Sequence, residues 1–383
     1  MALSKVKCEG YKAFKNTIEL HLRPITVIFG KNNTGKTTLT RLPLFVMASL
    51  GAPGFYRLNW NGLQFGNSFQ ELANVNQPHP DMWIEATTDD DLSFGVRLQH
   101  ITTFDKPDEV RVSELIVNGE SLEPGKIREA VDTAGRAILR FYPAKLDSSQ
   151  ANISEILSRA VHVPSGRSRI ESTYVTRKAR SLSVDDVPYM LATDSVLEHL
   201  VDRWFSNNLD GTRVAIDRAA FAFRLITSGA SGDVPLAQSG RGTQSALPVV
   251  TLLHASIIQT PKPSLLIIEE PEEHLHPSAH PALADLVIKA AESTKVVVET
   301  HSENFILRIR RRISEGSFSP SDLALYYVNE AHQLVDLMVD TTGFVADWPV
   351  GIFESDVEEA QAIVEARMAA IHDLGGTVAH SDE

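Results

Sequence analysis

The 383-residue sequence contains a single cysteine, Cys8, which excludes an intrachain disulfide and a cysteine-rich zinc site. It also lacks an apolar run long enough to cross a membrane, because its longest candidate, LPVVTLLHASII, is short and includes His254. The first residues, MALSKVKCEGYKAF, contain no apolar segment of the kind found in signal peptides. We therefore expect a cytoplasmic protein that makes no contact with membranes.

Basic residues are scarce relative to acidic ones, and the net charge is −13. This charge argues against a protein whose whole surface binds nucleic acid. Much of the acidity lies in residues 354–383, which contain eight acidic residues and one basic residue. The rest of the chain is only mildly acidic, so it could still present a local basic surface.

Three short apolar stretches, ITVIFG, PSLLIIEEP and KVVVETHS, predict buried strands of a parallel α/β sheet. Between residues 81 and 120, strand-like stretches separated by Asp- and Gly-rich turns predict an antiparallel sheet. The pattern of residues 183–209 predicts helices, and apolar residues at helical spacing predict another helix over 357–371.

The stretch FGKNNTGKTTL, residues 29–39, has the spacing of a phosphate-binding loop. Its glycines let backbone N–H groups face phosphates, and the N-terminus of the helix predicted over TTLTRLPLFVMASL attracts anions, although Pro43 sits early in that helix. Lys36 would reach the β- and γ-phosphates of ATP, and the Thr37 hydroxyl would bind Mg²⁺. A chance match in a glycine-containing turn is the alternative, which the flanking strand and helix disfavour. The predicted nucleotide-binding residues of this loop are Gly30, Asn32, Asn33, Thr34, Gly35, Lys36, Thr37 and Thr38.

Two further strand ends carry polar residues that could bind a metal ion or take part in catalysis. In LLIIEEPEEHLHP, Glu269 would lie beside Mg²⁺, and Glu270 could orient or deprotonate the attacking water. In VVVETHS, His301 could hydrogen-bond a γ-phosphate or hold that water. The alternatives are a solvated acidic turn for the glutamates and a core histidine for His301.

The stretch AQSGRGTQSALPVV places Ser239, Gly240 and Gly242 at the start of an apolar helix. Small residues at a helix N-terminus form an anion site, and in a two-fold dimer this site could face the γ-phosphate of the partner's ATP. A glycine turn without a ligand is the alternative.

In this order, the four motifs resemble those of ABC-type ATPase heads in the RecF-like, SMC-like branch that includes the OLD-family ATPase domains. The Glu-Glu-Pro and Thr-His-Ser stretches are the most specific parts of a resemblance that covers nearly the whole chain. DWPVGIF, residues 347–353, resembles the C-terminal module of a subgroup of short bacterial AAA-type ATPases. The resemblance implies an α/β fold: an ABC-type P-loop ATPase head with an antiparallel β portion and a small helical lid.

The resemblance also implies a role for each motif residue. Ser239, Gly240 and Gly242 would be a loosely matched signature, Glu269 a magnesium ligand, Glu270 the catalytic base and His301 the switch histidine. The resemblance further places two aromatic residues near the nucleotide base, Tyr11 and Phe14, and offers two candidates for the glutamine between loop and lid, Gln64 and Gln70.

Three departures from the family pattern limit what the resemblance implies. Glu269 stands where an Asp is usual, as it does in the OLD-like branch. The gap between the lobes is too short for long coiled-coil arms, and the last fifty residues lack the acids of a TOPRIM nuclease. We therefore expect no nuclease activity from this chain alone.

Four parts follow from the resemblance. Residues 1–182 would form an N-terminal ATPase lobe with the phosphate loop and a β-rich portion, and residues 183–235 a helical lid. Residues 236–345 would form a C-terminal ATPase lobe, and residues 346–383 a C-terminal module with an acidic tail helix.

ATP would join two such heads into a homodimer and hydrolysis would release them, so the biological output requires a partner. We expect the ATPase subunit of a bacterial anti-phage defence complex that controls a separate effector. A RecF-like DNA-repair ATPase is the alternative, and a transporter subunit is disfavoured by the degenerate signature.

Two basic clusters, GRSRIESTYVTRKAR and RIRRRI, could touch DNA phosphates. A solvated or partner-facing surface is the preferred interpretation, because no aromatic stacking platform accompanies either cluster.

Overall fold

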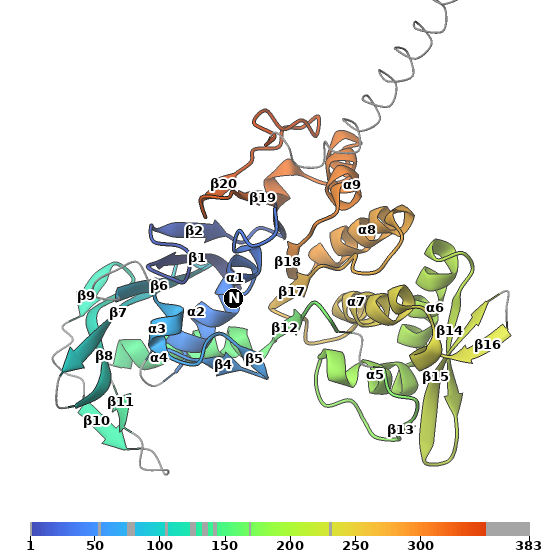
Figure 1. Ribbon diagram of the computed structural model, residues 1–383, viewed down its shortest axis with the longest axis horizontal. Helices are drawn as coiled ribbons and strands as arrows, with labels where there is room; N and C mark the ends of the chain where they lie inside the picture. Colours follow the sequence, from blue (N-terminus) through green and yellow to red (C-terminus); the bar gives the residue numbers. More distant parts are fainter. Residues whose placement is uncertain are drawn as a thin grey trace, which may run out of the picture. The chain divides into compact units, whose positions relative to one another are not determined.

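The structure is a computed structural model that describes residues 2–52, 55–74, 81–103, 106–122, 128–131, 137–140, 144–167, 170–229 and 232–349 (Figure 1). Met1–Val345 forms one compact unit and Ala346–Glu383 a second. The helix predicted over 357–371 and most of the DWPVGIF module lie outside the described residues. The finer division into lobes and lid stays a prediction.

A six-stranded sheet, mostly parallel, organises the chemistry-bearing motifs. Its order is β12 (Ala160–Val163), β17 (Leu265–Glu269), β18 (Lys295–Glu299), β3 (Ile25–Gly30), β19 (Leu323–Val328) and β20 (Leu334–Asp336), with only β20 antiparallel. The β3 and β17 strands are buried along their whole length, which explains their uninterrupted apolar sequence. Because β3, β17 and β18 run parallel, the motifs that follow them meet at one edge.

Helices connect and flank these strands. They are α1 (Lys36–Thr40), α2 (Leu42–Leu50), α7 (Arg241–Ile258), α8 (His280–Ala291) and α9 (Glu303–Ser314). The single helix predicted after the phosphate loop is in fact two, since α1 ends at Thr40 and Pro43 occupies the first turn of α2. Proline is tolerated there because the first-turn N–H groups have no intrahelical acceptor.

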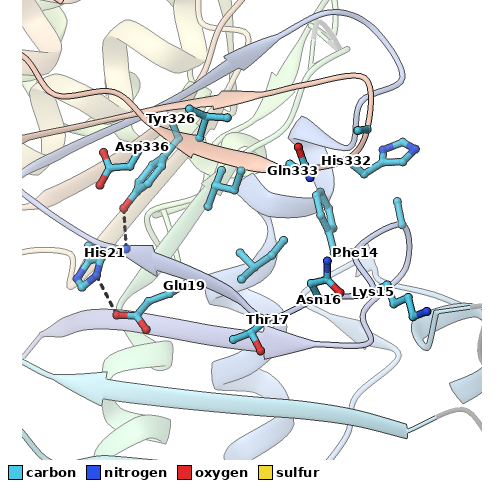
Figure 2. A pocket seen from close by; sticks show the side chains of 15 residues that line it. Phe14, Lys15, Asn16, Thr17, Glu19, His21, Tyr326, His332, Gln333 and Asp336 are labelled. Atoms are coloured by element: carbon cyan, nitrogen blue, oxygen red, sulfur yellow. Dashed lines mark hydrogen bonds and ion pairs between the residues drawn. The ribbon is translucent and has the colours of Figure 1, made fainter. Parts of the chain in front are cut away.

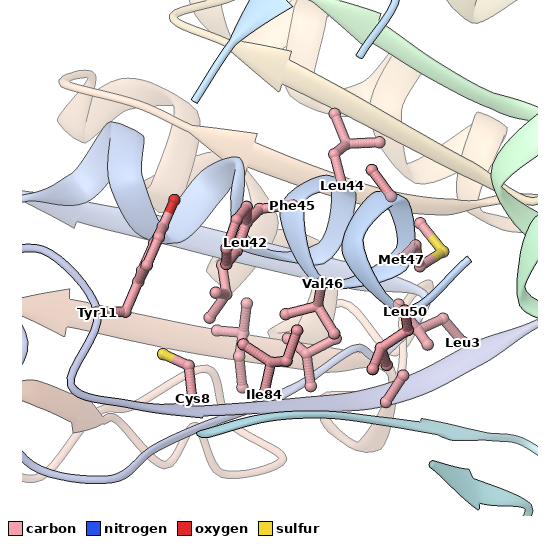
Figure 3. Packing of buried hydrophobic residues seen from close by; sticks show 14 of the residues in the cluster. Leu3, Cys8, Tyr11, Leu42, Leu44, Phe45, Val46, Met47, Leu50 and Ile84 are labelled. Carbon is pink, nitrogen blue, oxygen red and sulfur yellow. The ribbon is translucent and has the colours of Figure 1, made fainter. Parts of the chain in front are cut away.

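The antiparallel portion is a second six-stranded sheet, as the sequence predicted. Its order is β2 (Ile18–His21), β1 (Leu3–Glu9), β6 (Asp81–Thr88), β7 (Ser93–Thr103), β8 (Lys106–Val117) and β9 (Glu120–Leu122). Every residue of α2 is buried, and Figure 3 shows Val46 and Leu50 lying over Ile84 and Leu3. Each such side chain contributes roughly 1.5–3 kcal/mol by its burial, so this helix fixes the phosphate loop onto the antiparallel sheet.

The predicted lid contains a sheet as well as helices. The helices are α5 (Val187–Thr193) and α6 (Ser195–Asn208), and the strands are β14 (Arg213–Arg218), β15 (Ala222–Gly229) and β16 (Gly232–Pro235). A further strand, β13 (Tyr174–Val175), precedes the predicted bounds of the lid and pairs with β15. The α6 helix starts where the Asp194 carboxylate accepts hydrogen bonds from the N–H groups of Val196 and Leu197.

The remaining elements are short or peripheral. They are β4 (Asn59–Trp60), β5 (Leu63–Gln64), α3 (Phe69–Leu72), β10 (Arg128–Val131), β11 (Ala137–Arg140) and α4 (Ala144–Ser158). Among the helices of the described residues, none has the length and apolar character needed to cross a bilayer.

Candidate functional site

The phosphate loop follows β3 and depends on two glycines in left-handed backbone conformations. Gly30 has φ 148° and Gly35 has φ 100°. A Cβ atom on Gly30 would overlap the Val328 carbonyl oxygen, and one on Gly35 would lie 2.8 Å from the Phe14 ring. Both positions therefore require glycine for space as well as for conformation.

Lys36 opens α1 and is held inside the loop. Its side chain is buried, and its Nζ donates a hydrogen bond to the Lys31 carbonyl oxygen at 2.5 Å. Burial lowers the pKa of Lys36 from its ordinary value, while the nearby Glu299 and Glu270 favour the charged form. A polyphosphate within the loop would provide the opposite charge that this partly desolvated ammonium needs.

Thr37 links the loop to the neighbouring strand. Its Oγ1 donates to Glu299 Oε1 at 2.7 Å, and Glu299 is the last residue of β18. Burial raises the pKa of Glu299 to about 7, with Glu269 adding to the shift and the Thr37 hydrogen bond opposing it. Glu299 and Glu269 are register partners on β18 and β17, so two carboxylates end adjacent strands.

Glu269 is surrounded by donors. Arg41 donates to both of its oxygens, the His162 imidazole lies 2.7 Å from Oε1, and the Ser165 N–H lies 3.2 Å from Oε2. Although burial opposes ionisation, hydrogen bonds from Arg41 and His162 hold the pKa of Glu269 at about 2. The magnesium role of Glu269 stays a prediction.

Glu270 has φ 44°, a left-handed conformation that is strained for a glutamate. Its N–H donates to the Glu299 carbonyl oxygen at 2.8 Å, and its own carbonyl accepts from Arg167 Nη2 at 2.8 Å. These two bonds fix the turn that points the half-buried carboxylate toward the site. Burial raises the pKa of Glu270, and the nearby Glu273 carboxylate adds to this effect.

His301 lies beside Glu270, with its Nε2 3.9 Å from Glu270 Oε1. The Glu272 carboxylate orients this segment, because Oε1 accepts from the His301 N–H at 2.6 Å and from the Thr300 hydroxyl at 2.8 Å. Burial lowers the pKa of His301, and the Lys36 charge lowers it further. The structure thus brings Lys36, Thr37, Glu270 and His301 to one edge, as the sequence predicted.

Ser239, Gly240 and Gly242 lie at the start of α7. Gly240 is the residue that precedes the helix, and the Ser239 hydroxyl donates to the Leu236 carbonyl oxygen at 2.8 Å. An added Cβ on Gly242 would lie 2.6 Å from the His274 carbonyl oxygen, whereas one on Gly240 would meet nothing within 4 Å. Gly242 therefore has a packing role within its own chain, and its role toward a partner's ATP stays a prediction.

Arg167 belongs to the first basic cluster, yet its side chain is inside the protein with 4% of the residue exposed. Its guanidinium donates to the carbonyl oxygens of Ser245 (3.0 Å), Glu269 (2.7 Å) and Glu270 (2.8 Å). It therefore connects α7 to the turn that carries Glu270 and cannot contact DNA.

The second basic cluster, in α9, is largely neutralised by ion pairs. Arg308 and Arg312 both pair with Asp285, Arg311 pairs with Glu315, and Arg310 donates to the Gly343 carbonyl oxygen. These contacts agree with the interpretation of a solvated or partner-facing surface. Arg169 of the first cluster lies outside the described residues.

Tyr11 and Phe14 do not present the base-contacting surface that the sequence suggested. Both are 1% exposed; Tyr11 stacks on Phe45 with ring centroids 4.6 Å apart, and Phe14 lies against Gly35. Phe14 thus packs against the phosphate loop at Gly35, whereas Tyr11 packs against α2. Gln64 and Gln70 are both exposed, on β5 and α3, and the structure does not separate them.

A cavity of about 580 Å³ that was not predicted adjoins the loop, between residues 13–21 and the β19–β20 hairpin (Figure 2). His332 lines it, and its Nδ1 donates to the Thr34 carbonyl oxygen at 2.9 Å. Phe14 lines the same cavity. The hairpin is thereby attached to the phosphate loop.

Four polar partners in the site were not predicted from the sequence: Arg41, His162, Arg167 and Glu299. Glu299 stands directly before the Thr-His-Ser motif, at a strand end, and this position was the available signal. His162 is a polar residue in an otherwise apolar strand, which was a weaker one.

Comparisons with known proteins agree with this geometry. Residues 25–308, more than half of the chain, match the family model described as "AAA domain, putative AbiEii toxin, Type IV TA system". The Old nuclease of Escherichia phage P2 is 20% identical over 365 residues, which cover 79% of this chain but only 57% of that relative. An SMC head, crystallised with the C-terminal winged-helix domain of ScpA, has a TM-score of 0.56 at 13% identity, with 88% of this chain and 98% of that chain covered. This likeness shows the fold, which confirms the predicted ABC-type P-loop ATPase head. The chain belongs to the AAA domain family whose model it matches.

Proposed function

We propose that this chain binds and hydrolyses ATP at the end of β3, forms an ATP-dependent homodimer, and controls a separate effector protein. The observation that carries the proposal is the convergence of Lys36, Thr37, Glu270 and His301 at one edge of the parallel sheet. Membership of an AAA family supports the ATPase part.

Each of the residues at this edge of the sheet has its own role in binding or hydrolysing ATP. The loop N–H groups and the Lys36 ammonium bind the β- and γ-phosphates. The Glu270 carboxylate, whose pKa is raised, accepts a proton from the attacking water or orients that water. The neutral form of His301, which its environment favours, hydrogen-bonds the γ-phosphate without adding charge to the site.

The residues near Thr37 also fit a divalent cation. Hydroxyl and carboxylate oxygens are the donors that Mg²⁺ prefers, and Thr37 and Glu299 offer both at the end of the loop. Mg²⁺ bound there would neutralise charge on the β- and γ-phosphates.

The dimer part of the proposal rests on α7. The exposed Gly240 precedes the helix, so the first-turn N–H groups are available to an anion supplied by a second copy. Each active site would then combine the Lys36 loop of one protomer with the α7 start of its partner. The SMC-head fold supports this arrangement by analogy.

The family match bears on the effector and on a role in anti-phage defence. The matched family description names a toxin–antitoxin system, which supports action on a separate partner. The ion pairs of the α9 arginines reduce the support for the alternative, a RecF-like DNA-repair ATPase. ATPase stimulation by DNA ends would favour the alternative, and copurification of a second protein from the native host would favour the effector.

ATP hydrolysis by purified variants tests the proposal. Lys36→Ala should lose ATP binding, and Glu270→Gln should keep binding while turnover falls by about 10²–10⁴. Glu292→Gln, a matched change at an exposed glutamate after α8, should keep wild-type activity. Near-normal hydrolysis by Glu270→Gln would rule out its role as the base.

No variant, nor the wild type, should cut DNA, and metal-dependent cleavage that disappears in a point mutant would contradict this expectation.

A further inference from the structure

Glu299 has one carboxylate oxygen satisfied and one free. Its Oε1 accepts from the Thr37 hydroxyl at 2.7 Å. Its Oε2 is buried and has no hydrogen-bond partner within the described part of the chain, and the residue is only 2% exposed. An unpartnered buried carboxylate oxygen costs free energy, and a ligand that binds it would recover that cost.

Glu269, the acid expected beside magnesium, has no comparable vacancy. Arg41 contacts both of its oxygens, and His162 and Ser165 contact one each. To bind a cation, this carboxylate would have to give up a charge-assisted pair and bring two positive charges close together.

The sheet order explains why the two acids differ. Strand β18 lies between β3 and β17, so Glu299 is one strand closer to the phosphate loop than Glu269. Only Glu299 therefore meets Thr37. Two other groups also face this point, since ligand atoms of Glu270, Glu299 and His301 lie within 4.8 Å of one another.

We propose that Glu299, rather than Glu269, is the acidic ligand of the divalent cation that accompanies the nucleotide, and that Thr37 binds the same cation. Glu269 then acts as a structural anchor for Arg41 and His162. This inference rests on the proposed nucleotide-binding function. The oxygen donors select a hard cation, Mg²⁺ or Mn²⁺.

Mn²⁺ binding to the protein–ADP complex tests the assignment without measuring turnover. Free Mn²⁺ is quantified by its electron paramagnetic resonance signal in wild type, Glu299→Gln and Glu269→Gln. The two variants carry the same chemical change at register-matched positions. Glu299→Gln should weaken Mn²⁺ binding by at least about tenfold, and Glu269→Gln should change it by less than about threefold. The reverse order, or equal losses, would overturn the assignment.

A second pair of variants reports directly whether a cation binds at the substituted position in the folded protein. Glu299→Cys should bind Cd²⁺ in the presence of ADP and show thiolate-to-Cd²⁺ charge-transfer absorption, because a thiolate prefers a soft cation. Glu269→Cys should lack this absorption, and the native Cys8, which is buried in both proteins, provides an equal background. Absorption in Glu269→Cys alone, or in neither variant, would contradict the proposal.

Binding of ADP in the presence of EDTA distinguishes a defect in cation binding from a defect in nucleotide binding. If wild type and Glu299→Gln bind metal-free ADP equally, a difference in Mn²⁺ affinity belongs to the cation site. If wild type does not bind ADP or ATP under any condition, the proposed function itself fails, and the Glu299 assignment fails with it.

Discussion

The Arg41 guanidinium and the Glu269 carboxylate form a two-bond ion pair, with Nε 2.5 Å from Oε1 and Nη2 2.7 Å from Oε2. Glu269 is fully buried, whereas the Arg41 side chain is 28% exposed. Removal of Arg41 alone would leave a buried carboxylate with His162 as its remaining possible cation. The pair therefore makes a specific prediction about stability.

Arg41→Leu should lower the free energy of unfolding by about 3 kcal/mol at neutral pH, because breaking a buried pair leaves a charge uncompensated. The double variant Arg41→Leu/Glu269→Gln should recover much of that loss. Urea denaturation of the two single variants and the double variant measures this coupling. A loss below about 1 kcal/mol in Arg41→Leu would show that the pair has little effect on stability.

The contribution of this pair to the stability of the folded state depends on pH, and the sign of that dependence follows from the pKa of Glu269. The pKa of Glu269 is lowered to about 2, so its ionised form stabilises the folded state above its ordinary pKa of 4.5. That contribution should be lost as the pH falls from 4.5 toward 2.

Arg167→Leu should destabilise the fold and slow ATP turnover together. The guanidinium satisfies carbonyl oxygens of Ser245, Glu269 and Glu270, and Glu270 is held in a strained conformation. We expect a loss of about 3 kcal/mol or more in the free energy of unfolding. Arg180→Leu is the matched control, since Arg180 is exposed, and it should stay within about 0.5 kcal/mol of wild type. Equal stability of the two variants would disprove the connecting role of Arg167.

His254, in the interior of α7, should make stability fall in mild acid. Burial and the Lys289 charge lower the pKa of His254 from 6.5 to about 4. Protonation therefore favours the unfolded state, and stability present above pH 6.5 is lost as the pH falls toward 4. Between about pH 7 and about pH 5 the expected loss from this group is about 2 kcal/mol. His254→Leu should flatten the profile by that amount in urea denaturation, and an unchanged slope would contradict the prediction.

Much of the site was predictable because the phosphate loop and the two strand-end motifs are local in sequence. Each motif follows a buried parallel strand, so the topology brings Lys36, Glu270 and His301 together. The break between α1 and α2 was not predicted, although Pro43 was the visible signal.

The partners of each acid were not predictable, because they depend on contacts between distant residues. Arg41 and Glu269 are 228 positions apart, and Thr37 and Glu299 are 262 apart. Motif spacing gives no information on which of two neighbouring glutamates receives an arginine. The inward direction of Arg167 was hidden for the same reason, since its acceptors lie on α7 and after β17.

A mixing experiment tests whether the active site is shared between protomers. Gly240→Asp is the better partner for Lys36→Ala than a change at Gly242, because an added Cβ at Gly240 meets no atom within 4 Å. Each variant should be inactive alone, since one cannot hold ATP and the other places an acid opposite the γ-phosphate. With random exchange of protomers, the mixture should recover roughly a quarter of wild-type ATPase activity.

Gly240→Ala controls for the loss of the glycine itself and should stay active. If chain exchange is demonstrated and the mixture stays as inactive as its components, the shared site is wrong. If Gly240→Asp is active by itself, the start of α7 is an ordinary turn that does not act on the partner's ATP.

Sedimentation velocity of Glu270→Gln, with and without ATP and Mg²⁺, tests the central claim of ATP-driven dimerisation most directly. This variant should bind ATP without releasing it by hydrolysis, so the joined state should accumulate. Glu270→Gln should be a monomer without nucleotide and a dimer with ATP, and the double variant Lys36→Ala/Glu270→Gln should be a monomer under both conditions. An unchanged sedimentation coefficient of Glu270→Gln on ATP addition, despite measured ATP binding, would contradict the claim.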